Sequence, residues 1–209
     1  MNKNPFFDPT LKKKPNIFIA ILQILVVFTA LVILLYLFVI TPSQVDGPSM
    51  EPNFYTGELL LTNRLVQWFG ITPIGKSIGM DYVRGDVVTF QKPGYKEFVK
   101  RIIGVPGDFV AIRDGYIYVN NSKLQEDYLP PALYTSGGDY LVEGGESALV
   151  EEGFYIAIGD NRPVSNDSRF QSISQVDRKW IKGRVILRFF PFEKFSIIPT
   201  GKYELINEK

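Results

Sequence analysis

The feature that most constrains this chain is an uncharged run of 25 residues, Asn16 to Ile40, NIFIAILQILVVFTALVILLYLFVI. At 1.5 Å per residue, a helix of that length measures about 37 Å, which is enough to cross a hydrocarbon core of about 30 Å with some tilt. A cleaved signal peptide would have a shorter apolar region, of about 7–15 residues, followed by a small-residue cleavage site. This run is longer and ends in bulky residues, so we expect an uncleaved, single-pass transmembrane helix over residues 16–40.

Basic residues flank only one end of this run. Lys3 and the triplet Lys12 to Lys14 precede it, whereas no Lys or Arg occurs over residues 41–63. By the positive-inside rule, residues 1–15 form a cytoplasmic tail and residues 41–209 an extracytoplasmic domain. The sequence thus predicts a protein of the plasma (inner) membrane, with an outer part long enough for one domain with its own core.

The chain has no cysteine and no histidine. The first absence excludes disulfides and thiolate chemistry, and the second excludes a Ser-His-Asp triad and the H-E-x-x-H metal motif. A proton shuttle would have to be Lys, Asp, Glu, Tyr or a terminus, and we expect no metal or other cofactor. Of 23 basic and 22 acidic residues, four basic and one acidic precede residue 42. The outer part is therefore close to neutral, and we expect no nucleic-acid partner.

Past residue 41 the pattern changes to short runs rich in branched and aromatic residues, separated by turn signals. The pair Asp114-Gly115 is a hairpin signal, and no segment shows a sustained helical period. We expect a mostly β, sandwich- or barrel-like domain. The strand-like runs are 58–62, 86–90, 97–103, 108–113, 116–120, 154–159 and 183–190. Residues 121–152, polar and rich in Gly and Pro, are expected to form an extended loop, a hairpin excursion or a small insertion.

Two short motifs match by chance. Residues 70–77, GITPIGKS, fit the phosphate-binding pattern G-x-x-x-x-G-K-[ST], but that mechanism needs a strand before the motif and a helix after it. Here Gly79 and a turn follow, so we expect no nucleotide partner. The tripeptide Arg84-Gly85-Asp86 is interpreted as a turn into a strand.

Ser49 lies in the segment VDGPSMEPNF, a few residues after the apolar run. A serine hydroxyl is a weak nucleophile until a base takes its proton. Without histidine, a lysine is the natural candidate, although only about 0.04% of free lysine is neutral at pH 7. Burial lowers a lysine pKa because it penalises the charged form. The candidate base is therefore a lysine that a strand holds inside the protein.

The run EFVKRII supplies that lysine. Strand alternation places Phe98, Lys100 and Ile102 on one face and Val99, Arg101 and Ile103 on the other. Both faces are apolar around a cation, so the pattern leaves open which cation is buried, or whether Lys100 only extends to solvent from an edge strand. Arginine does not deprotonate in proteins, so Lys100 is the possible base.

A dense polar segment, GDNRPVSNDSR over residues 159–169, follows the apolar run FYIAI. Its side chains could hold the loop rigid through hydrogen bonds and Asp–Arg pairs. An exposed polar turn is the alternative.

The segments GPSMEP, FVKRIIGVPGD and GDNRPVSNDSR, in this order behind a single span, resemble those of type I signal peptidases of the bacterial Ser-Lys kind. The resemblance extends from the apolar run to about Phe190. It implies a coiled antiparallel β-sheet fold shared with the self-cleaving SOS repressors. It also implies a membrane-anchored serine endopeptidase that removes N-terminal signal peptides from exported precursors by acyl-enzyme chemistry. Cleavage would follow small residues, in an Ala-x-Ala-like pattern.

The resemblance assigns roles to individual residues. Ser49 would be the nucleophile and Lys100 the general base, with Ser165 orienting the lysine. Asp167 and Arg169 would form a supporting pair, with Asp160 as a nearby supporting acid.

The resemblance extends to the oxyanion hole and the substrate pockets. The backbone N–H of Ser49 would be one oxyanion donor, but Gly47 stands where some members have a serine as the second. Asn53 replaces a common threonine, a milder departure. The residues that match the substrate-binding wall are Val45, Met50, Phe54, Phe98 and Val99.

Chain length adds a constraint that does not depend on the family. Nine residues separate Ile40 from Ser49, so the two are at most about 30 Å apart. The partners expected are signal-peptide-bearing precursors and the lipid bilayer. Trp68, Phe69 and Ile71 would lie either in the membrane interface or in the core. The alternatives are a non-catalytic, membrane-tethered β module and a self-cleaving Ser-Lys repressor-type protein; the oligomeric state is not indicated.

Overall fold

The computed structural model describes residues 16–131 and 133–207, and the chain divides into two compact units at residues 37 and 38. The first unit contains helix α1 (Ile17–Phe38), long and apolar enough to cross a membrane. The side chain of Asn16 caps its start by accepting the N–H of Phe18 at 3.1 Å. The helix ends two residues before the predicted boundary because Ile40 already pairs with Asn63 in a β-ladder. The expected cytoplasmic tail lies outside the described residues.

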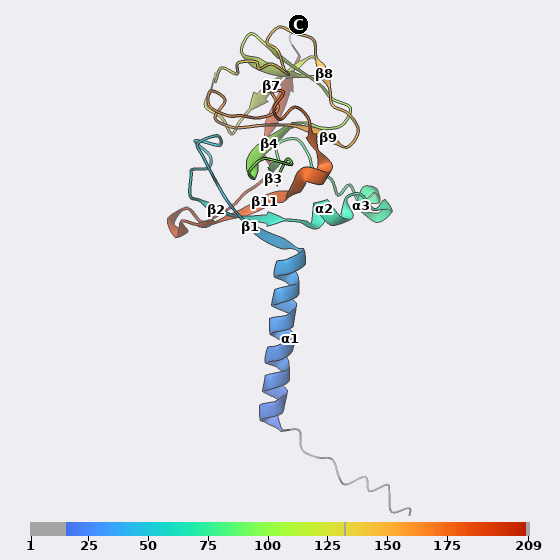
Figure 1. Ribbon diagram of the computed structural model, residues 1–209, viewed down its shortest axis with the longest axis vertical. Coiled ribbons are helices and arrows are strands. Elements are labelled where there is room, and N and C mark those ends of the chain that lie inside the picture. The colour runs from blue at the N-terminus through green and yellow to red at the C-terminus, as the bar shows by residue number, and fades with distance from the viewer. Residues whose placement is uncertain (1–15, 132, 208–209) are drawn as a thin grey trace, which may run out of the picture. The chain divides into compact units, whose positions relative to one another are not determined.

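The second unit is built on two antiparallel sheets (Figure 1). In the larger sheet neighbouring strands pair in the order β1-β2-β11-β3-β4-β9-β10, and one more short strand, β12, pairs with β11. The strands are β1 (Ile40–Gln44), β2 (Leu59–Asn63), β3 (Val87–Phe90), β4 (Phe98–Gly104), β9 (Phe154–Ile158), β10 (Val176–Asp177), β11 (Ile181–Phe190) and β12 (Ser196–Ile197).

The smaller sheet has the strand order β13-β7-β6-β5-β8. Its central hairpin, β5 to β6, turns through Asp114 and Gly115, both with positive φ, as the Asp-Gly signal predicts. Its strands are β5 (Phe109–Arg113), β6 (Tyr116–Val119), β7 (Ser122–Glu126), β8 (Ala148–Leu149) and β13 (Tyr203–Ile206).

The fold is mostly β and antiparallel, with one N-terminal apolar helix, as the sequence predicts. Register shifts in β4 and β11 mark β-bulges, which bend strands and raise their twist. Each of the seven strand-like runs forms a strand, with bounds within two residues of the expected ones. Residues 121–152 are not a bare loop, because they contribute β7 and β8.

Short helices outside α1 are the feature that the pattern did not predict. They are α2 (Leu65–Phe69), α3 (Pro73–Ser77), and two 3₁₀ turns, η1 (Arg178–Trp180) and η2 (Phe192–Lys194). Segments of three to five residues are too short to show a helical period. The phosphate-loop look-alike is confirmed as spurious, since a helix rather than a strand precedes it and α3 lies within it.

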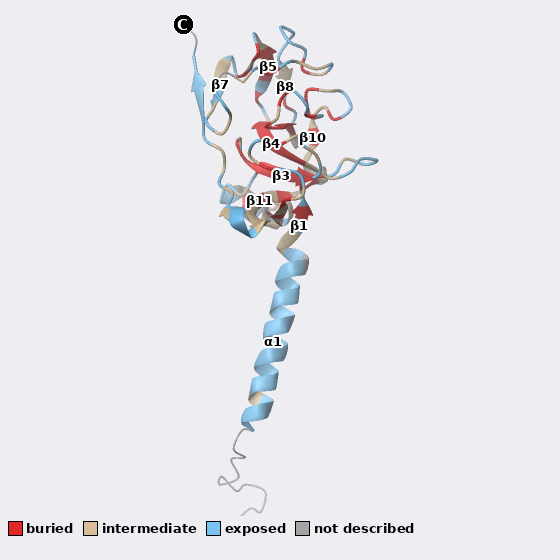
Figure 2. Cartoon of the chain, turned by 90° about the vertical axis from the view of Figure 1, so that its left-hand side faces the viewer, coloured by how far each residue is buried: buried red, intermediate tan, exposed pale blue. Residues whose placement is uncertain are grey.

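Strand β4 lies in the middle of the larger sheet, between β3 and β9. Six of its seven residues are buried, and Figure 2 shows β4 in the colour of buried residues. Because successive side chains point to opposite faces, both faces of β4 are covered. Ile102 belongs to one hydrophobic cluster, whereas Val99 and Ile103 belong to two others. Any polar group on this strand is therefore removed from water.

Candidate active site

Ser49 is held in the loop between β1 and β2 by the polar loop that follows β9. The backbone N–H of Asn161 donates to the carbonyl oxygen of Ser49 at 3.1 Å. The side-chain amide of Asn161 donates to the carbonyl oxygen of Pro48, also at 3.1 Å. Within the loop, Phe54 N–H donates to the Met50 carbonyl at 2.9 Å. These bonds fix the backbone on both sides of the hydroxyl.

Lys100 points at that hydroxyl from β4. Its Nζ lies 2.7 Å from Ser49 Oγ and 3.1 Å from the carbonyl oxygen of Val99. The residue is 2% exposed. Because β4 is an interior strand, the alternative of a lysine reaching solvent from a sheet edge is wrong.

Burial changes the acidity of this lysine. Removal from water lowers the pKa of Lys100 from 10.5 to about 8, against the opposing charges of Asp167 and Asp160. No carboxylate forms an ion pair with Lys100 in the described part of the chain. With a pKa of about 8, roughly a tenth of this amine is neutral at pH 7, compared with about 0.04% for free lysine.

Arg101, the next residue, is buried on the opposite face and stays charged. It is 4% exposed. Its Nε and Nη2 donate to both carboxylate oxygens of Asp160, at 2.9 and 2.6 Å. Burial alone would lower the pKa of Arg101, but the hydrogen bonds and charge of Asp160 raise it overall. The sequence left open which cation is buried; the structure buries both.

The charged residues and both serines of the loop over residues 159–169 are buried, although Pro163, Val164 and Asn166 are exposed, so a wholly exposed turn is wrong. Asp167 and Arg169 form an ion pair at 2.9 Å, with both residues almost fully buried. Asp167 also accepts the N–H of Gly159 at 3.0 Å, and Arg169 donates to the carbonyl oxygens of Arg162 and Ser165. The pair therefore ties together both ends of the loop that holds Ser49.

Ser165 differs from what the resemblance implies. Its hydroxyl is buried, and it has no hydrogen-bond partner among the described residues, so it does not bond to Lys100. It lies in a crowded place. A Cβ on Gly159 would come within 2.2 Å of Ser165 Oγ and 2.4 Å of the Ser49 carbonyl oxygen. Because Gly159 has no Cβ, the Ser165 hydroxyl and the Ser49 carbonyl oxygen can both lie close to its Cα.

The backbone at Ser49 suits an oxyanion donor. Its N–H has no hydrogen-bond acceptor among residues 16–131 and 133–207, and Pro48 has no N–H. Gly47 has φ of +93°, and a Cβ built there would meet nothing within 4 Å. The position where, by the resemblance, some members carry a serine side chain is thus open space in this chain.

The family can be identified on comparison with known proteins. A model described as signal peptidase, peptidase S26, matches residues 18–190 of this chain. The chain belongs to this family. Signal peptidase IB of Staphylococcus aureus is 35% identical over 169 residues, which cover 76% of this chain and 82% of that protein. Signal peptidase I of Bacillus licheniformis is 31% identical over 184 residues, covering 87% and 93%.

Among solved structures, a signal peptidase I from Enterococcus faecalis V583 is 28% identical, with a TM-score of 0.40, and covers 50% of this chain and 96% of that chain. Membership of the signal peptidase family makes this chain a serine endopeptidase that cleaves signal peptides. The two alternative classes, a non-catalytic module and a repressor-type protein, are therefore wrong.

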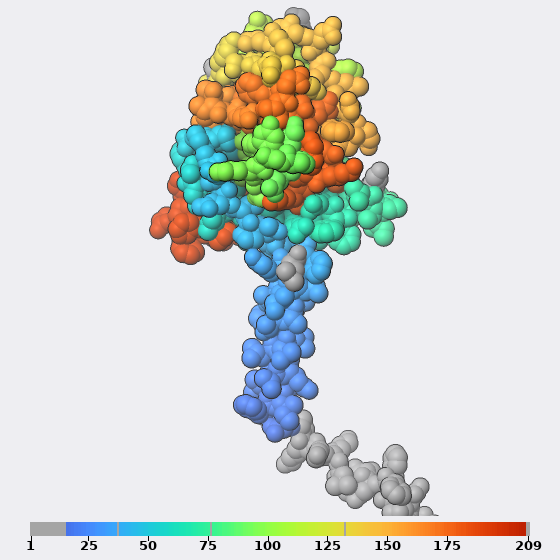
Figure 3. All heavy atoms as spheres, viewed as in Figure 1, coloured from blue at the N-terminus to red at the C-terminus, as the bar shows by residue number. Residues whose placement is uncertain are grey.

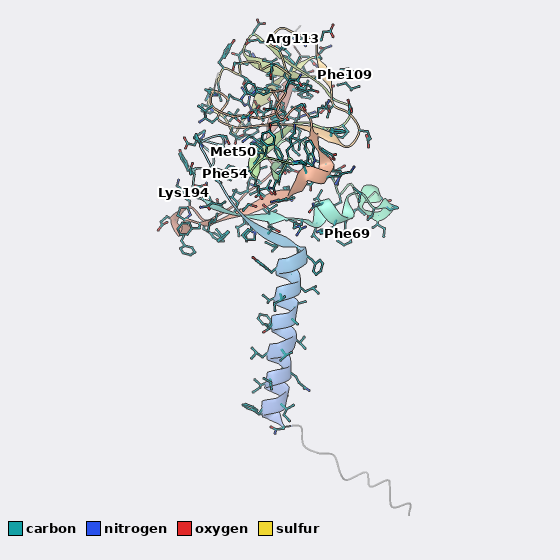
Figure 4. The ribbon with its side chains drawn as sticks, in the orientation of Figure 1. Met50, Phe54, Phe69, Phe109, Arg113 and Lys194 are labelled. Atoms are coloured by element: carbon teal, nitrogen blue, oxygen red, sulfur yellow. The ribbon has the colours of Figure 1, made fainter. Side chains whose placement is uncertain are left out.

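The residues expected to line the substrate pockets of this signal peptidase are mainly core residues. Val45, Met50, Phe54 and Val99 belong to one buried cluster with Leu60, Val87 and Val185; Figure 4 labels Met50 and Phe54. Phe98 is half-buried in a different cluster, and Lys100 Nζ lies 5.5 Å from the centre of its ring. Four of the five are thus buried in this cluster, and only Phe98 is partly exposed.

Several residues of the signal peptidase site were missed or undervalued from sequence. Asn53 donates to Asp160 at 2.8 Å and to the carbonyl oxygen of Tyr128 at 2.9 Å. The ring of Tyr128 lies 3.8 Å from the Arg101 guanidinium, and Glu126 pairs with Arg162 at 2.6 Å. Tyr128 and Glu126, from the segment 121–152, therefore contact residues that surround the site. Asn161 was noted from the sequence only as part of the polar loop, but its backbone and side chain bond to the carbonyl oxygens of Ser49 and Pro48.

Proposed function

We propose that Ser49 is the nucleophile and Lys100 the general base with which this chain removes signal peptides from exported precursors. The observation that supports it best is the 2.7 Å contact between Lys100 Nζ and Ser49 Oγ. The contact joins a hydroxyl to an amine whose pKa burial lowers to about 8. A charged lysine would donate across this contact, whereas a neutral one accepts the hydroxyl proton at the same separation.

The reaction is acyl transfer in two stages. Ser49 Oγ bonds to the scissile carbonyl carbon while Lys100 Nζ takes the hydroxyl proton. The intermediate then loses its C–N bond, and Lys100 returns the proton to the leaving amine, the new N-terminus of the mature protein. Water next attacks the ester carbon while Lys100 takes one of its protons, and Lys100 gives that proton to the Ser49 oxygen as the acyl C–O bond breaks. The signal peptide leaves with a free carboxylate.

In each stage, negative charge develops on the carbonyl oxygen of the substrate, and backbone N–H groups stabilise it by hydrogen bonds. We assign the Ser49 N–H as one oxyanion donor because it has no acceptor among the described residues. Gly47 contributes no hydroxyl, so the second donor is a backbone N–H or a water molecule. Asp160, Ser165, Asp167 and Arg169 act as positioning residues.

We also propose cleavage after small residues. The burial of Val45, Met50, Phe54 and Val99 in one apolar cluster supports shallow apolar pockets next to Ser49. Such pockets accept the small side chains of an Ala-x-Ala-like sequence. Phe98, half-buried and next to the lysine, is the member that can contact substrate directly.

We further propose that α1 anchors the protein in the plasma (inner) membrane as a single span. Four lysines precede the apolar run and no basic residue occurs over residues 41–63, which favours a cytoplasmic N-terminus and an extracytoplasmic domain over residues 41–209. Phe38 to Ser49 is only eleven residues, at most about 39 Å of extended chain. Ser49 therefore works near the bilayer surface, where the apolar part of a signal peptide ends.

The test is cleavage of a purified precursor by the detergent-solubilised full chain. Ser49→Ala and Lys100→Ala should each lower the rate by at least about 10²–10⁴-fold, with the same thermal unfolding behaviour for Ser49→Ala as for the wild type. Lys123→Ala, in strand β7 of the smaller sheet, is a matched lysine control that should cut normally. Unchanged cutting by either of the first two variants removes that residue from its role.

A further inference from the structure

A second cluster of cations lies in a pocket away from Ser49 and Lys100. The pocket has a volume of about 440 Å³ and is lined by residues of β1, α2, η1 and β11 and the chain after β3. The lining residues are Thr41, Arg64, Gln67, Gln91, Lys179, Trp180 and Lys182. No carboxylate is among the described residues that line it.

The charges of this pocket are only partly compensated. Lys182 forms an ion pair with Glu97. Within the described part of the chain, the Arg64 side chain contacts neutral groups: it donates to Gln67 at 3.2 Å and lies 5.1 Å from the ring centre of Trp68. Lys179, which is exposed, forms no ion pair with any described residue. Arg64 and Lys179 thus have no carboxylate partner among the described residues, and two such cations in one pocket favour an anion with several oxygen atoms.

Exposed apolar residues follow the lining residue Gln67 in the chain, and they favour one kind of anion. Trp68, Phe69 and Ile71 are 47%, 52% and 62% exposed. Ile74, in α3, and Ile78, just after it, are exposed too. The second compact unit, from residue 38 onward, is called the catalytic unit below. Figure 3 shows the α2–α3 segment projecting from its side, and Figure 4 labels Phe69 there. A soluble phosphate gains nothing from exposed apolar residues, whereas a phospholipid carries its phosphate next to acyl chains.

The pocket is also tied by chain length to the end of α1. Thr41, in its lining, follows Phe38 by three residues, so at most about 10 Å of extended chain separates them. If α1 spans the bilayer, as proposed above, this lining residue lies at the level of the headgroups.

A contrasting surface shows that apolar exposure alone does not make such a site. Phe192 and Ile197 are also strongly exposed. The cations near them in the chain, Arg188 and Lys194, both form ion pairs with Glu58, at 3.0 and 3.3 Å. Both of these cations thus share the carboxylate of Glu58, whereas Arg64 and Lys179 have no carboxylate partner among the described residues.

We propose that the pocket around Arg64 and Lys179 binds the phosphate of an anionic phospholipid, with the lipid's acyl chains against Trp68 and Phe69. The inference rests on the membrane anchoring proposed above. It would fix the catalytic unit against anionic patches of the bilayer, in a chosen orientation toward incoming precursors.

Of the two tryptophans of the chain, Trp180 lines this pocket and Trp68 lies 5.1 Å from the guanidinium of Arg64, which lines it. Lipid contacts at the pocket can therefore be measured by tryptophan emission. The full chain is reconstituted in phosphatidylcholine vesicles that contain a minor fraction of brominated phosphatidylglycerol or, separately, of brominated phosphatidylcholine. Bromine quenches tryptophan emission on contact. We expect selectivity for the anionic lipid of at least about fivefold, and a loss of about fivefold with Arg64→Gln or with Lys179→Gln.

The matched control is Arg113→Gln/Lys202→Gln, which removes two positive charges elsewhere. Arg113 lies at the opposite end of the catalytic unit from Phe69 (Figure 4). This variant should keep the selectivity. Equal quenching by the two lipids in the wild type overturns the proposal, as does an equal loss in the control. So does abolition of the selectivity by inorganic phosphate at constant ionic strength, which would mark a site for free phosphate.

Precursor cleavage by the wild type in lipid-free detergent is a separate readout. Cleavage without lipid selectivity would contradict the lipid site and leave the peptidase proposal intact. Lipid selectivity without cleavage would contradict the peptidase proposal and leave the lipid site intact. Emission spectra of all variants in detergent show whether the pocket itself is intact.

Discussion

The two faces of β4 show how one strand can hold two buried cations with opposite fates. Lys100 and Arg101 are adjacent and almost equally buried. On one face Asp160 forms two hydrogen bonds with Arg101, which keeps it charged. On the other face Lys100 meets a hydroxyl and a carbonyl oxygen but no carboxylate. The carboxylate that would keep Lys100 charged is bonded to Arg101 instead, which leaves the lysine with the lowered pKa that the proposed base role requires.

The largest expected effect comes from removing the compensated cation. Arg101→Leu leaves the Asp160 carboxylate buried without its partner, which costs about 3–5 kcal/mol of unfolding free energy. Thermal or urea unfolding of the detergent-solubilised chain measures it. The double variant Arg101→Leu/Asp160→Leu should recover much of the loss, because no buried charge remains. A double variant as unstable as the single one would show that the ion pair does not dominate this face.

Removing Lys100, which has no carboxylate partner among the described residues, should raise the unfolding free energy instead of lowering it. The pKa of Lys100 is lower in the folded chain, about 8, than its ordinary 10.5. Below about pH 8 the folded state therefore carries a costly buried charge, and stability rises between about pH 8 and 10.5 as the unfolded chain retains the proton. Lys100→Met should raise the unfolding free energy at pH 7 by up to about 3 kcal/mol and abolish that rise.

Lys96 is the control for this prediction. It lies just before the same strand and pairs with Asp46, but both side chains are exposed. Lys96→Met should change neither the stability nor its dependence on pH. Destabilisation by Lys100→Met at pH 7 would mean that the amine is not penalised by burial.

The smallest effect on stability is expected at Ser165. Its buried hydroxyl has no partner in the described part of the chain, so Ser165→Ala should stabilise the fold by about 1 kcal/mol. If the hydroxyl orients Lys100 once substrate is bound, kcat should fall about tenfold, well short of the loss on removing the base. Single-turnover cleavage separates this from weaker substrate binding. An unchanged kcat would leave Ser165 without a positioning role.

Much of the larger sheet could be predicted from the sequence because its interior strands carry branched and aromatic runs. Strands β1, β7 and β13 could not, since ITPSQ, SKLQE and YELI show no clear run or alternation. Their backbones form ladders because neighbouring strands are already in place. Propensity was outweighed there by tertiary pairing.

The candidate site, too, could be predicted from the sequence only in part. Ser49 and Lys100 could be proposed from residue chemistry and a resemblance, but the burial of Lys100 could not. Alternation gave two equally apolar faces, and only the sheet order shows that β4 is an interior strand. The bond between Arg101 and Asp160 joins residues 59 positions apart, and local patterns carry no information on such pairs.

The central claim is that the amine at residue 100 is neutral often enough to take the Ser49 proton. The most direct measurement is the pH dependence of kcat/KM for precursor cleavage, which reports the ionisation of the free enzyme. The account predicts an alkaline rise whose midpoint lies near pH 8, where Lys100 loses its charge. A midpoint near 10.4, the value of lysine in water, would contradict it, as would a rise that persists in Lys100→Ala.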